Sequence, residues 1–404
     1  MPNRPAPLWT RNFLLLFITG FLMNFGFQFL LPTLPLYAMD QLGANPAQIG
    51  YLISAYAIAA LLVRPFSGYA YDSLGKKKTY LLSMAFFTAL TFTYQYAGTF
   101  FLFLCFRFLH GLTFGVASTG SATLLADIVP PARRGEGMGI HGLTHTLSMA
   151  VGPAAGLWIL AASGYPRLFA GAGFFITLSF VISFFIDYPR QPAAAQKISV
   201  SSIFEKRVVS VAILAMCTSS LFSGVVAFIT VYGKAINVDD VSLFFVINSL
   251  GVILTRIFAG RVQDRSGPKP VITFGYLVMA AGFIALSQSR GVAMLYFSAL
   301  LIGLGNGSIM PALQAMVIDM VEPERRGVAT STHFMALDLG IAGGSVILGW
   351  VAELTSLSTM FFLGAFYLLL PLFLFLSYSL RDYEAKAAAV GDTVKKISYQ
   401  DTAG

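Results

Sequence analysis

Long apolar segments alternate with short polar ones along almost all of this chain of 404 residues. A helix of about 20 apolar residues is long enough to cross the ~30 Å hydrocarbon layer of a membrane. The segments that meet this length cover residues 11–37, 46–69, 78–97, 99–124, 136–161, 166–187, 207–232, 240–261, 270–289, 291–316, 328–354 and 358–380. The pattern therefore predicts an all-α membrane protein with twelve transmembrane helices.

The two halves of the chain are related by an offset of 192 residues, without a gap from Arg64 to Trp158. Apolar composition alone does not explain the matches, which include Gly68/Gly260, Asp72/Asp264, Gly111/Gly303, Arg134/Arg326, Gly152/Gly344 and Trp158/Trp350. A duplication in a membrane protein predicts two pseudo-symmetric six-helix bundles with a site between them. We expect these bundles at residues 1–187 and 207–380, a cytoplasmic linker at 188–206 and a cytoplasmic tail at 381–404.

The distribution of charge predicts an orientation. Only 11% of the residues are charged, and the mean hydropathy is +0.74. Most of the 26 Lys and Arg residues fall in the termini and in the loops after even-numbered segments, whereas Arg167, Lys234 and Arg290 fall in the opposite loops. This bias predicts a cell (inner) membrane protein with both termini in the cytoplasm. It also accounts for the net charge of +8 by contact with lipid, so nucleic-acid binding is not expected.

A basic turn follows the second segment and returns, in weaker form, after the eighth. The first copy reads Gly68-Tyr-Ala-Tyr-Asp72-Ser-Leu-Gly75-Lys76-Lys77-Lys78, and the second reads Gly260-Arg-Val-Gln-Asp264-Arg265-Ser-Gly267-Pro-Lys269. Both resemble the loop signature of the major facilitator superfamily, G-x-x-x-D-R-x-G-R-K/R. The resemblance covers nearly the whole chain, although Ser73 stands where the family usually has Arg.

The resemblance implies that these loops form a latch, a set of contacts made in one access state and broken in another. Asp72 would face the N-terminus of the eleventh helix, and Asp264 would have the mirror role. Lys76 or Lys77 would pair with Asp127. The expected latch residues are Gly68, Asp72, Gly75, Lys76, Lys77, Asp127, Arg134, Asp264, Arg265 and Arg326. The alternative is an ordinary, solvated basic loop.

The fourth segment carries Arg107, with His110, Gly111 and Gly115 after it. A charge inside a membrane span is costly in lipid, so this arginine is expected to face protein or water and to have a partner. The pattern resembles the superfamily's helix-4 motif R-x-x-x-G, whose arginine is linked with proton coupling. The alternative is a structural arginine bonded to carbonyl groups.

The fifth segment carries a proline among small residues, at Ser148, Gly152, Pro153 and Gly156. Proline removes one backbone hydrogen bond and bends a helix, while the small residues allow close packing. The set is similar to the signature G-x-x-x-G-P-x-x-G-G of exporters in the superfamily. With this motif, the chain resembles the twelve-helix drug and sugar efflux group, which exchanges substrate for protons.

Ionisable residues inside the segments are candidates for proton coupling. Asp338 lies about 15 Å into the eleventh segment at about 1.5 Å per residue, where an unpaired charge costs several kcal/mol. The candidates are Asp338, Arg107, His110 and His145. The alternative is a permanently hydrogen-bonded side chain, and the repeat mates His141 and His333 are expected to be structural. Metal binding is not expected because no further ligands complete a set.

Helices 1, 4, 7 and 10 line the substrate cavity in the family, as the resemblance implies. The corresponding polar and aromatic positions are Asn24, Gln28, Phe114, Phe222, Asn306 and Gln314. This aromatic, weakly polar set suits a small amphipathic organic compound.

Together these features predict a monomeric secondary transporter that needs no cofactor. We expect it to export such a compound in exchange for protons, by rocking one half against the other. No nucleophile–base pair, metal motif or phosphate loop predicts an enzyme. The alternatives are proton-coupled uptake, flipping of a lipid-linked substrate, and a non-transporting membrane receptor.

Overall fold

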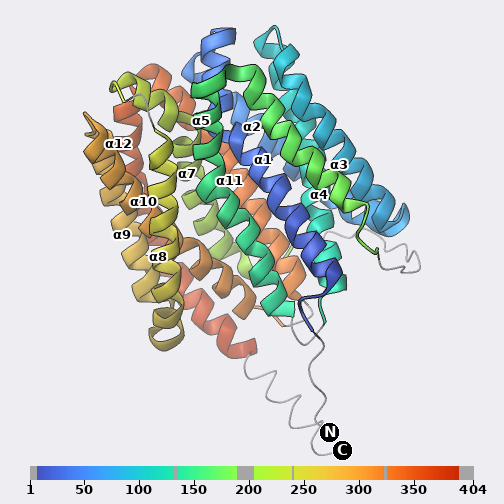
Figure 1. Cartoon of the computed structure of the whole chain (residues 1–404). Helices are drawn as coiled ribbons and strands as arrows, with labels where there is room; N and C mark the ends of the chain where they lie inside the picture. The colour runs from blue at the N-terminus through green and yellow to red at the C-terminus, as the bar shows by residue number, and fades with distance from the viewer. Residues whose placement is uncertain (1–6, 131–133, 189–203, 239–240, 323–324, 391–404) are drawn as a thin grey trace, which may run out of the picture. The chain divides into compact units, whose positions relative to one another are not determined.

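The computed structural model describes residues 7–130, 134–188, 204–238, 241–322 and 325–390 (Figure 1). Among these residues, ten helices are long and apolar enough to cross a membrane. That number treats residues 140–183 as one helix, although its backbone breaks at Gly164, and it omits a helix that begins with three lysines, Lys76–Thr93. With these two corrections, the helices match the twelve predicted spans and confirm an all-α membrane fold.

The helices of the first half are α1 (Arg11–Leu42), α2 (Pro46–Ser73), α3 (Lys76–Thr93), the 3-10 turn η1 (Tyr94–Tyr96), α4 (Phe100–Ile128) and α5 (Arg134–Ser183). Those of the second half are η3 (Lys206–Val208), α7 (Val209–Ala235), α8 (Ser242–Ser266), α9 (Pro268–Ser287), α10 (Val292–Asp319), α11 (Arg326–Leu354), α12 (Leu357–Tyr367), α13 (Leu369–Leu374) and the π-helical turn η5 (Phe375–Ser379). Gly164, with φ 75° and ψ 178°, separates the predicted fifth and sixth spans within α5.

The first residues of the predicted cytoplasmic tail, 381–404, are helical. The helical segment that begins at Leu357 continues to Val390. Alanines 387–389 and the neighbouring Glu384 and Lys386 are good helix formers, so the helix extends beyond its apolar part. The rest of the tail and residues 189–203 of the predicted linker lie outside the described residues.

The chain divides into two compact units. Unit 1 comprises residues 1–197, 226–233 and 239–246, and unit 2 comprises residues 198–225, 234–238 and 247–404. The proposed domain boundaries remain a proposal, and each unit is described by itself below.

The glycines of the two basic turns have the same backbone conformation. Gly75 precedes α3 with φ 90°, and its repeat mate Gly267 precedes α9 with φ 74°. L-residues with a side chain rarely adopt a φ in this range, whereas glycine does so freely. The duplicated glycine is therefore explained by the sharp reversal of the chain between two antiparallel helices.

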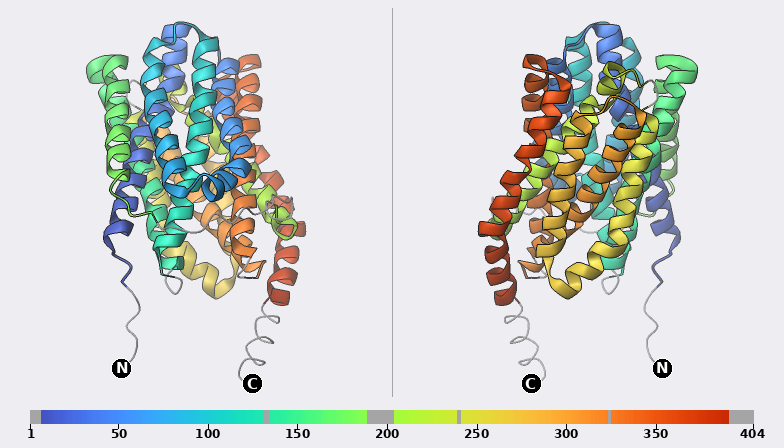
Figure 2. Two further views of the ribbon diagram at one scale, coloured as in Figure 1. Left: turned by 90° about the vertical axis from the view of Figure 1, so that its right-hand side faces the viewer. Right: turned by 90° about the vertical axis from the view of Figure 1, so that its left-hand side faces the viewer.

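A second duplicated pair allows helices to touch at their backbones. A Cβ on Gly111 of α4 would lie 2.3 Å from the carbonyl oxygen of Tyr56 on α2. A Cβ on Gly303 of α10 would lie 2.0 Å from the carbonyl oxygen of Asn248 on α8. Tyr56 and Asn248 are themselves 192 residues apart, so each unit makes the same contact with the same positions. The right-hand view of Figure 2 shows α10 beside α8 and α9 in unit 2.

A third contact joins the first helix of each half to the fifth. A Cβ on Gly152 of α5 would lie 2.5 Å from Cβ of Gln28 on α1, and these two helices run side by side in Figure 1. In unit 2, a Cβ on Gly344 of α11 would lie 2.3 Å from the carbonyl oxygen of Ser220 on α7. Lipid supplies no hydrophobic drive for helix association, so close backbone packing of this kind holds membrane helices together.

Substitution of two neighbouring glycines on α11 tests this packing. We expect Gly344→Ala to lower the thermal unfolding midpoint in detergent micelles, because its methyl group would overlap the backbone of Ser220. Gly343→Ala is the matched control, since a Cβ there meets nothing within 4 Å. Alanine also favours a helix by about 1 kcal/mol over glycine, so the control should unfold at the same or a higher temperature. Equal midpoints for the two variants would contradict the proposed contact.

Candidate functional site

Arg107 is buried inside unit 1 although it carries a full positive charge. It is 2% exposed on α4, and its Cζ lies 4.3 Å from the centre of the Tyr56 ring and 6.0 Å from that of Phe27. Contacts with aromatic faces stabilise a guanidinium without neutralising it. Within unit 1, no carboxylate that the structure describes forms an ion pair with Arg107, and its Nε is buried without a hydrogen-bond partner.

A tyrosine connects Arg107 to His110. Arg107 Nη1 donates to the hydroxyl of Tyr94 at 3.5 Å, and this hydroxyl lies 2.7 Å from His110 Nδ1. The other ring nitrogen, Nε2, lies 3.4 Å from Thr91 Oγ1 on α3. The ring of Phe87 stacks on the imidazole with centroids 4.2 Å apart. Sequence reasoning identified Arg107 and His110 but missed Tyr94, because tyrosine near the end of a span is common at membrane interfaces.

The small residues of the exporter-type motif on α5 all face α1. Ser148 Oγ donates to the carbonyl oxygen of Phe21 at 3.1 Å. Gly152 meets Gln28, and a Cβ on Gly156 would lie 2.6 Å from the carbonyl oxygen of Phe29. Pro153 is buried within the same helix. The motif therefore forms a continuous, close contact between the two helices, which explains why it requires small residues.

One expected contact of the latch set is present. Lys76 Nζ lies 2.5 Å from Asp127 Oδ2, and the side chains are only 9% and 15% exposed. Lys77 and Arg265 are exposed, and Gly75 forms the turn described above. The expected partners at Gly68, Asp72, Arg134, Asp264 and Arg326 lie outside the residues whose side chains are described. The contact between Lys76 and Asp127 is thus confirmed, whereas the switching role of the latch set stays a prediction.

The predicted cavity residues of unit 1 have different surroundings. Asn24 is half-buried and donates from Nδ2 to the carbonyl oxygen of Gly20 at 2.8 Å. Gln28 is buried against Gly152. Phe114 is half-buried and stacks on Phe27 with centroids 5.4 Å apart. Phe114 therefore belongs to the aromatic group that surrounds Arg107.

The predicted residues of unit 2 lie on three helices. Phe222 on α7 and Asn306 on α10 are half-buried, and Gln314 on α10 is exposed. The Oδ1 atom of Asn306 is buried without a hydrogen-bond partner in the described structure. Asp338 on α11 is half-buried, one residue after Leu337, whose carbonyl oxygen accepts a hydrogen bond from Ser219 of α7 at 3.0 Å. Its position inside a membrane-spanning helix agrees with the sequence, and its role in coupling stays a prediction.

The remaining histidines fall into two groups. His145 on α5 is exposed, so its candidate role in coupling also stays a prediction. His141 contacts α4 and α1: its Nε2 lies 3.1 Å from Ser121 Oγ, and its ring would meet a Cβ on Gly20 at 2.9 Å. Its repeat mate His333 is 2% exposed on α11. Within the described residues, no group of three metal-ligating side chains includes them.

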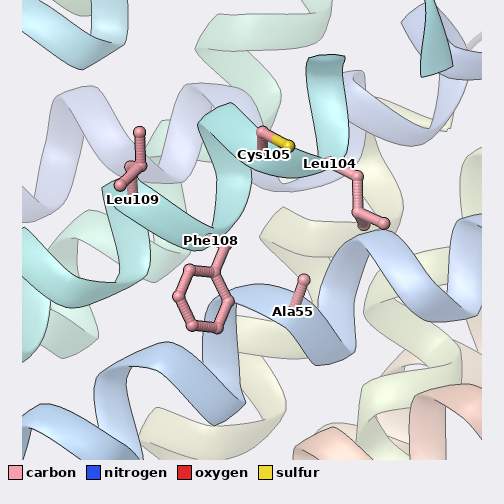
Figure 3. Close-up of a pocket in the computed structure, with 5 residues that line it drawn as sticks. All are labelled: Ala55, Leu104, Cys105, Phe108 and Leu109. Atoms are coloured by element: carbon pink, nitrogen blue, oxygen red, sulfur yellow. The ribbon is translucent and has the colours of Figure 1, made fainter. Parts of the chain in front are cut away.

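Two surface hollows of the described structure involve none of the predicted cavity residues. One is an apolar groove between α2 and α4, lined by Ala55, Leu104, Cys105, Phe108 and Leu109 (Figure 3). The other lies in unit 2 among α8, α9 and α10 and is lined in part by Gln263, Pro311 and Asp319. The apolar groove has the character of a surface that faces lipid tails, not that of a polar substrate site.

Sequence reasoning also missed an ion-pair group in unit 2, formed by Glu205, Arg207, Glu322 and Arg325. Arg207 Nη1 donates to both carboxylate oxygens of Glu322, at 2.7 and 2.6 Å, and Arg325 Nε donates to Glu205. Lys386 donates to the carbonyl oxygen of Arg207 at 2.7 Å. The group connects the end of the linker to the α10–α11 loop and to the C-terminal helix. The repeat mates of Glu205, Arg207 and Glu322 are the uncharged Phe13, Leu15 and Pro130. Arg325 alone of the four has a charged mate, Arg133, so the duplication gave no signal for the acids of the group.

The ion-pair group changes the pKa of its acids. Burial raises the pKa of the Glu205 carboxyl, but hydrogen bonds from Arg325 and from the Arg207 backbone, with both positive charges, lower the pKa on balance. The hydrogen bonds from the Arg207 side chain lower the pKa of Glu322. Both acids therefore stay charged at neutral pH and stabilise the folded state there.

Membrane-spanning helices that pack by the same backbone-to-backbone contacts in each unit, with a buried cation in unit 1, are typical of a membrane transporter of the duplicated type. Comparison with known proteins gives the family. The family model of the Major Facilitator Superfamily matches residues 16–239 and 208–398. The chain belongs to this superfamily, so it is a multi-pass membrane transporter and not an enzyme.

Relatives of known name are distant in sequence. An uncharacterized MFS-type transporter of Methanocaldococcus jannaschii is 25% identical over 88% of this chain and 95% of its own length. The staphylopine export protein of Staphylococcus aureus is 23% identical, over 81% and 86% respectively. The quinolone resistance protein NorA of the same species is 28% identical, over 40% of this chain and 42% of its own.

Solved structures share the fold. A nucleoside transporter, NupG, has a TM-score of 0.75 at 17% identity, covering 91% of this chain and 99% of its own. A peptide transporter of the POT family has a TM-score of 0.78 at 14% identity, covering 95% and 97%. At these identities the likeness concerns the fold alone.

Acid titration tests the ion-pair group of unit 2. A lowered carboxyl pKa contributes stability that is present above the unfolded pKa and is lost as the pH falls through the folded pKa. We therefore expect the thermal unfolding midpoint in detergent to drop from roughly pH 5 downward, and to drop less steeply in a Glu205→Gln/Glu322→Gln variant. Asp187→Asn is the control, because Asp187 is 77% exposed and pairs with Arg11 at 3.8 Å. An unchanged pH slope in the double variant would show that these acids do not carry the effect.

Proposed function

We propose that the protein exports a small amphipathic organic compound in exchange for protons, by alternating access. The observation that carries the proposal is the presence of two ionisable residues, one in each half, whose repeat mates are not ionisable. Arg107 is buried within a span and has Ala299 as its repeat mate, and Asp338 lies within a span and has Thr146. Charged side chains are expensive inside a membrane, so the absence of a charge at each repeat-mate position favours a role in transport over a role in the scaffold.

Asp338 is the proposed proton carrier. A carboxyl about 15 Å into a spanning helix is more stable neutral than charged, unless a cation or water stabilises its charge. In the proposed cycle it binds a proton in one access state and releases it in the other. Arg107 is the proposed countercharge that favours release, and His110 and His145 are secondary candidates for the proton.

Two observations favour export. The tight contact of Ser148, Gly152 and Gly156 with α1 has the residues of the exporter-type motif. Two of the relatives named above are an export protein and a drug resistance protein.

The aromatic character of the expected cavity residues, among them Phe114 and Phe222, fits an amphipathic compound with little fixed charge.

The proposal includes the arrangement in the membrane. The bias of Lys and Arg places both termini in the cytoplasm of a cell (inner) membrane. Lys76 and Asp127 would then belong to a cytoplasmic latch that opens as the two halves rock. The protein would act as a monomer, without a cofactor.

Asp338→Asn tests the coupling role in proteoliposomes, with a fluorescent quinolone as the probe. An amide cannot release a proton, so accumulation driven by a pH gradient should fall at least about tenfold. Exchange of labelled for unlabelled quinolone needs no net proton movement and should persist, which shows that the variant is folded. Asp187→Asn is the matched control, because Asp187 is an exposed acid beyond the end of α5. Full gradient-driven accumulation by Asp338→Asn would exclude Asp338 as the carrier.

A further inference from the structure

The hydrogen bond from Thr91 to the backbone leads to one consistent assignment of donors and acceptors around His110. Thr91 Oγ1 donates its single hydrogen to the carbonyl oxygen of Phe87 at 2.9 Å. In its contact with His110 Nε2 the threonine can therefore only accept, so Nε2 carries the hydrogen. A neutral imidazole with Nε2–H leaves Nδ1 as an acceptor, and the Tyr94 hydroxyl, 2.7 Å away, is its donor. Tyr94 oxygen then accepts from Arg107.

The result is a single chain of donors that runs from Arg107 through Tyr94, His110 and Thr91 to a backbone carbonyl. All four side chains are at most 2% exposed. They come from three consecutive elements, α3, η1 and α4, and the flat face of the guanidinium rests on Tyr56 of α2. In a site that excludes water, hydrogen bonds polarise one another and hold their members in one orientation.

The second half of the protein provides an internal control. At the repeat-mate positions of Thr91, Tyr94, Arg107 and His110, unit 2 has Phe283, Leu286, Ala299 and Ile302. All four are completely buried and apolar. At these four positions unit 2 is thus built with apolar side chains, although the neighbouring Asn248, the mate of Tyr56, donates from Nδ2 to the carbonyl oxygen of Ala299 at 3.1 Å. Apolar residues are the less costly choice in a membrane. The polar chain in unit 1 is therefore not required by the architecture.

We propose that Tyr94, His110 and Thr91 are positioning residues that fix the guanidinium of Arg107 for its part in coupling. The inference rests on the proposed function of Arg107 and assigns its hydrogen-bonding partners. Tyr94 gives Arg107 an acceptor, and its donation to His110 Nδ1 fixes the position of the hydroxyl that does so. Thr91 in turn keeps the hydrogen of His110 on Nε2. A substitution of Thr91 or of Tyr94 is therefore expected to change the orientation of the Arg107 guanidinium.

The first test needs no substrate. With ¹⁵N-labelled histidine, and with the His110 signal assigned by its loss in His110→Gln, nuclear magnetic resonance distinguishes the two ring nitrogens. We expect a neutral ring with Nε2–H and a hydrogen-bonded Nδ1 at neutral pH. Tyr94→Phe should shift the Nδ1 signal, and Thr91→Val should release the ring to the other tautomer, whereas Thr91→Ser should retain the wild-type signals. A hydrogen on Nδ1 in the wild type, or signals that Tyr94→Phe does not move, would overturn the proposal.

The second test measures transport of the quinolone probe. Loss of one buried hydrogen bond to a charged group typically corresponds to about a tenfold change or more, so we expect Tyr94→Phe to lower kcat about tenfold with little change in KM. Tyr276→Phe is the control: Tyr276 is equally buried in α9 and its hydroxyl lies 3.0 Å from Thr218 Oγ1. In an Arg107→Lys background, Tyr94→Phe should have little further effect, because both changes act on one contact.

The outcomes separate this inference from the proposed function. If the wild type moves the quinolone and Tyr94→Phe retains its kcat, the positioning role is wrong while proton-coupled export stands. If the wild type moves no protons with the quinolone, the proposed function fails, and the resonance measurement still decides whether the donor chain exists.

Discussion

Close approach of helix backbones is the constraint on which both units depend. In lipid, helices gain little from hiding apolar side chains, so packing and hydrogen bonds must hold them together. Gly111 against Tyr56 and Gly303 against Asn248 show the same solution twice, at positions 192 residues apart. The duplicated residues are thus mainly those that allow contact or reversal of the chain. A scaffold built in this way leaves few positions free for costly polar groups.

The two halves share this scaffold but differ in their buried charged residues, and this difference indicates which residues serve function. Arg107 is buried on aromatic faces and donates to Tyr94, whereas the uncharged Ala299 lies at the same place in unit 2. Lipid-embedded protein does not retain a buried guanidinium without compensation. The asymmetry therefore connects the packing of the fold to its proposed chemistry: the scaffold is symmetric, and the residues assigned to coupling are not.

The sequence predicted the helices and the duplication well because both depend on local patterns. The twelve spans could be inferred from the hydrophobic period, and the turn glycines Gly75 and Gly267 from the repeat offset. The pair of Lys76 or Lys77 with Asp127 was implied by the resemblance to the family's loop signature. Tyr94 and the Glu205–Arg325 pair could not be inferred in any of these ways. Tyr94 acts through residues that are distant in sequence and lie on other elements, and Glu205 lies in a linker whose mate in the first half is Phe13. The contacts of Tyr94 and Glu205 depend on tertiary packing, which cannot be predicted from hydrophobic periodicity or from the repeat.

The direction of proton movement tests the central claim most directly. Purified wild-type protein would be reconstituted with a pH-sensitive dye inside the vesicles, and a quinolone gradient would be imposed at equal pH on both sides. The account predicts that protons move opposite to the quinolone, and that no proton movement occurs in vesicles without protein. Protons that move in the same direction as the quinolone, or quinolone transport without proton movement, would contradict it.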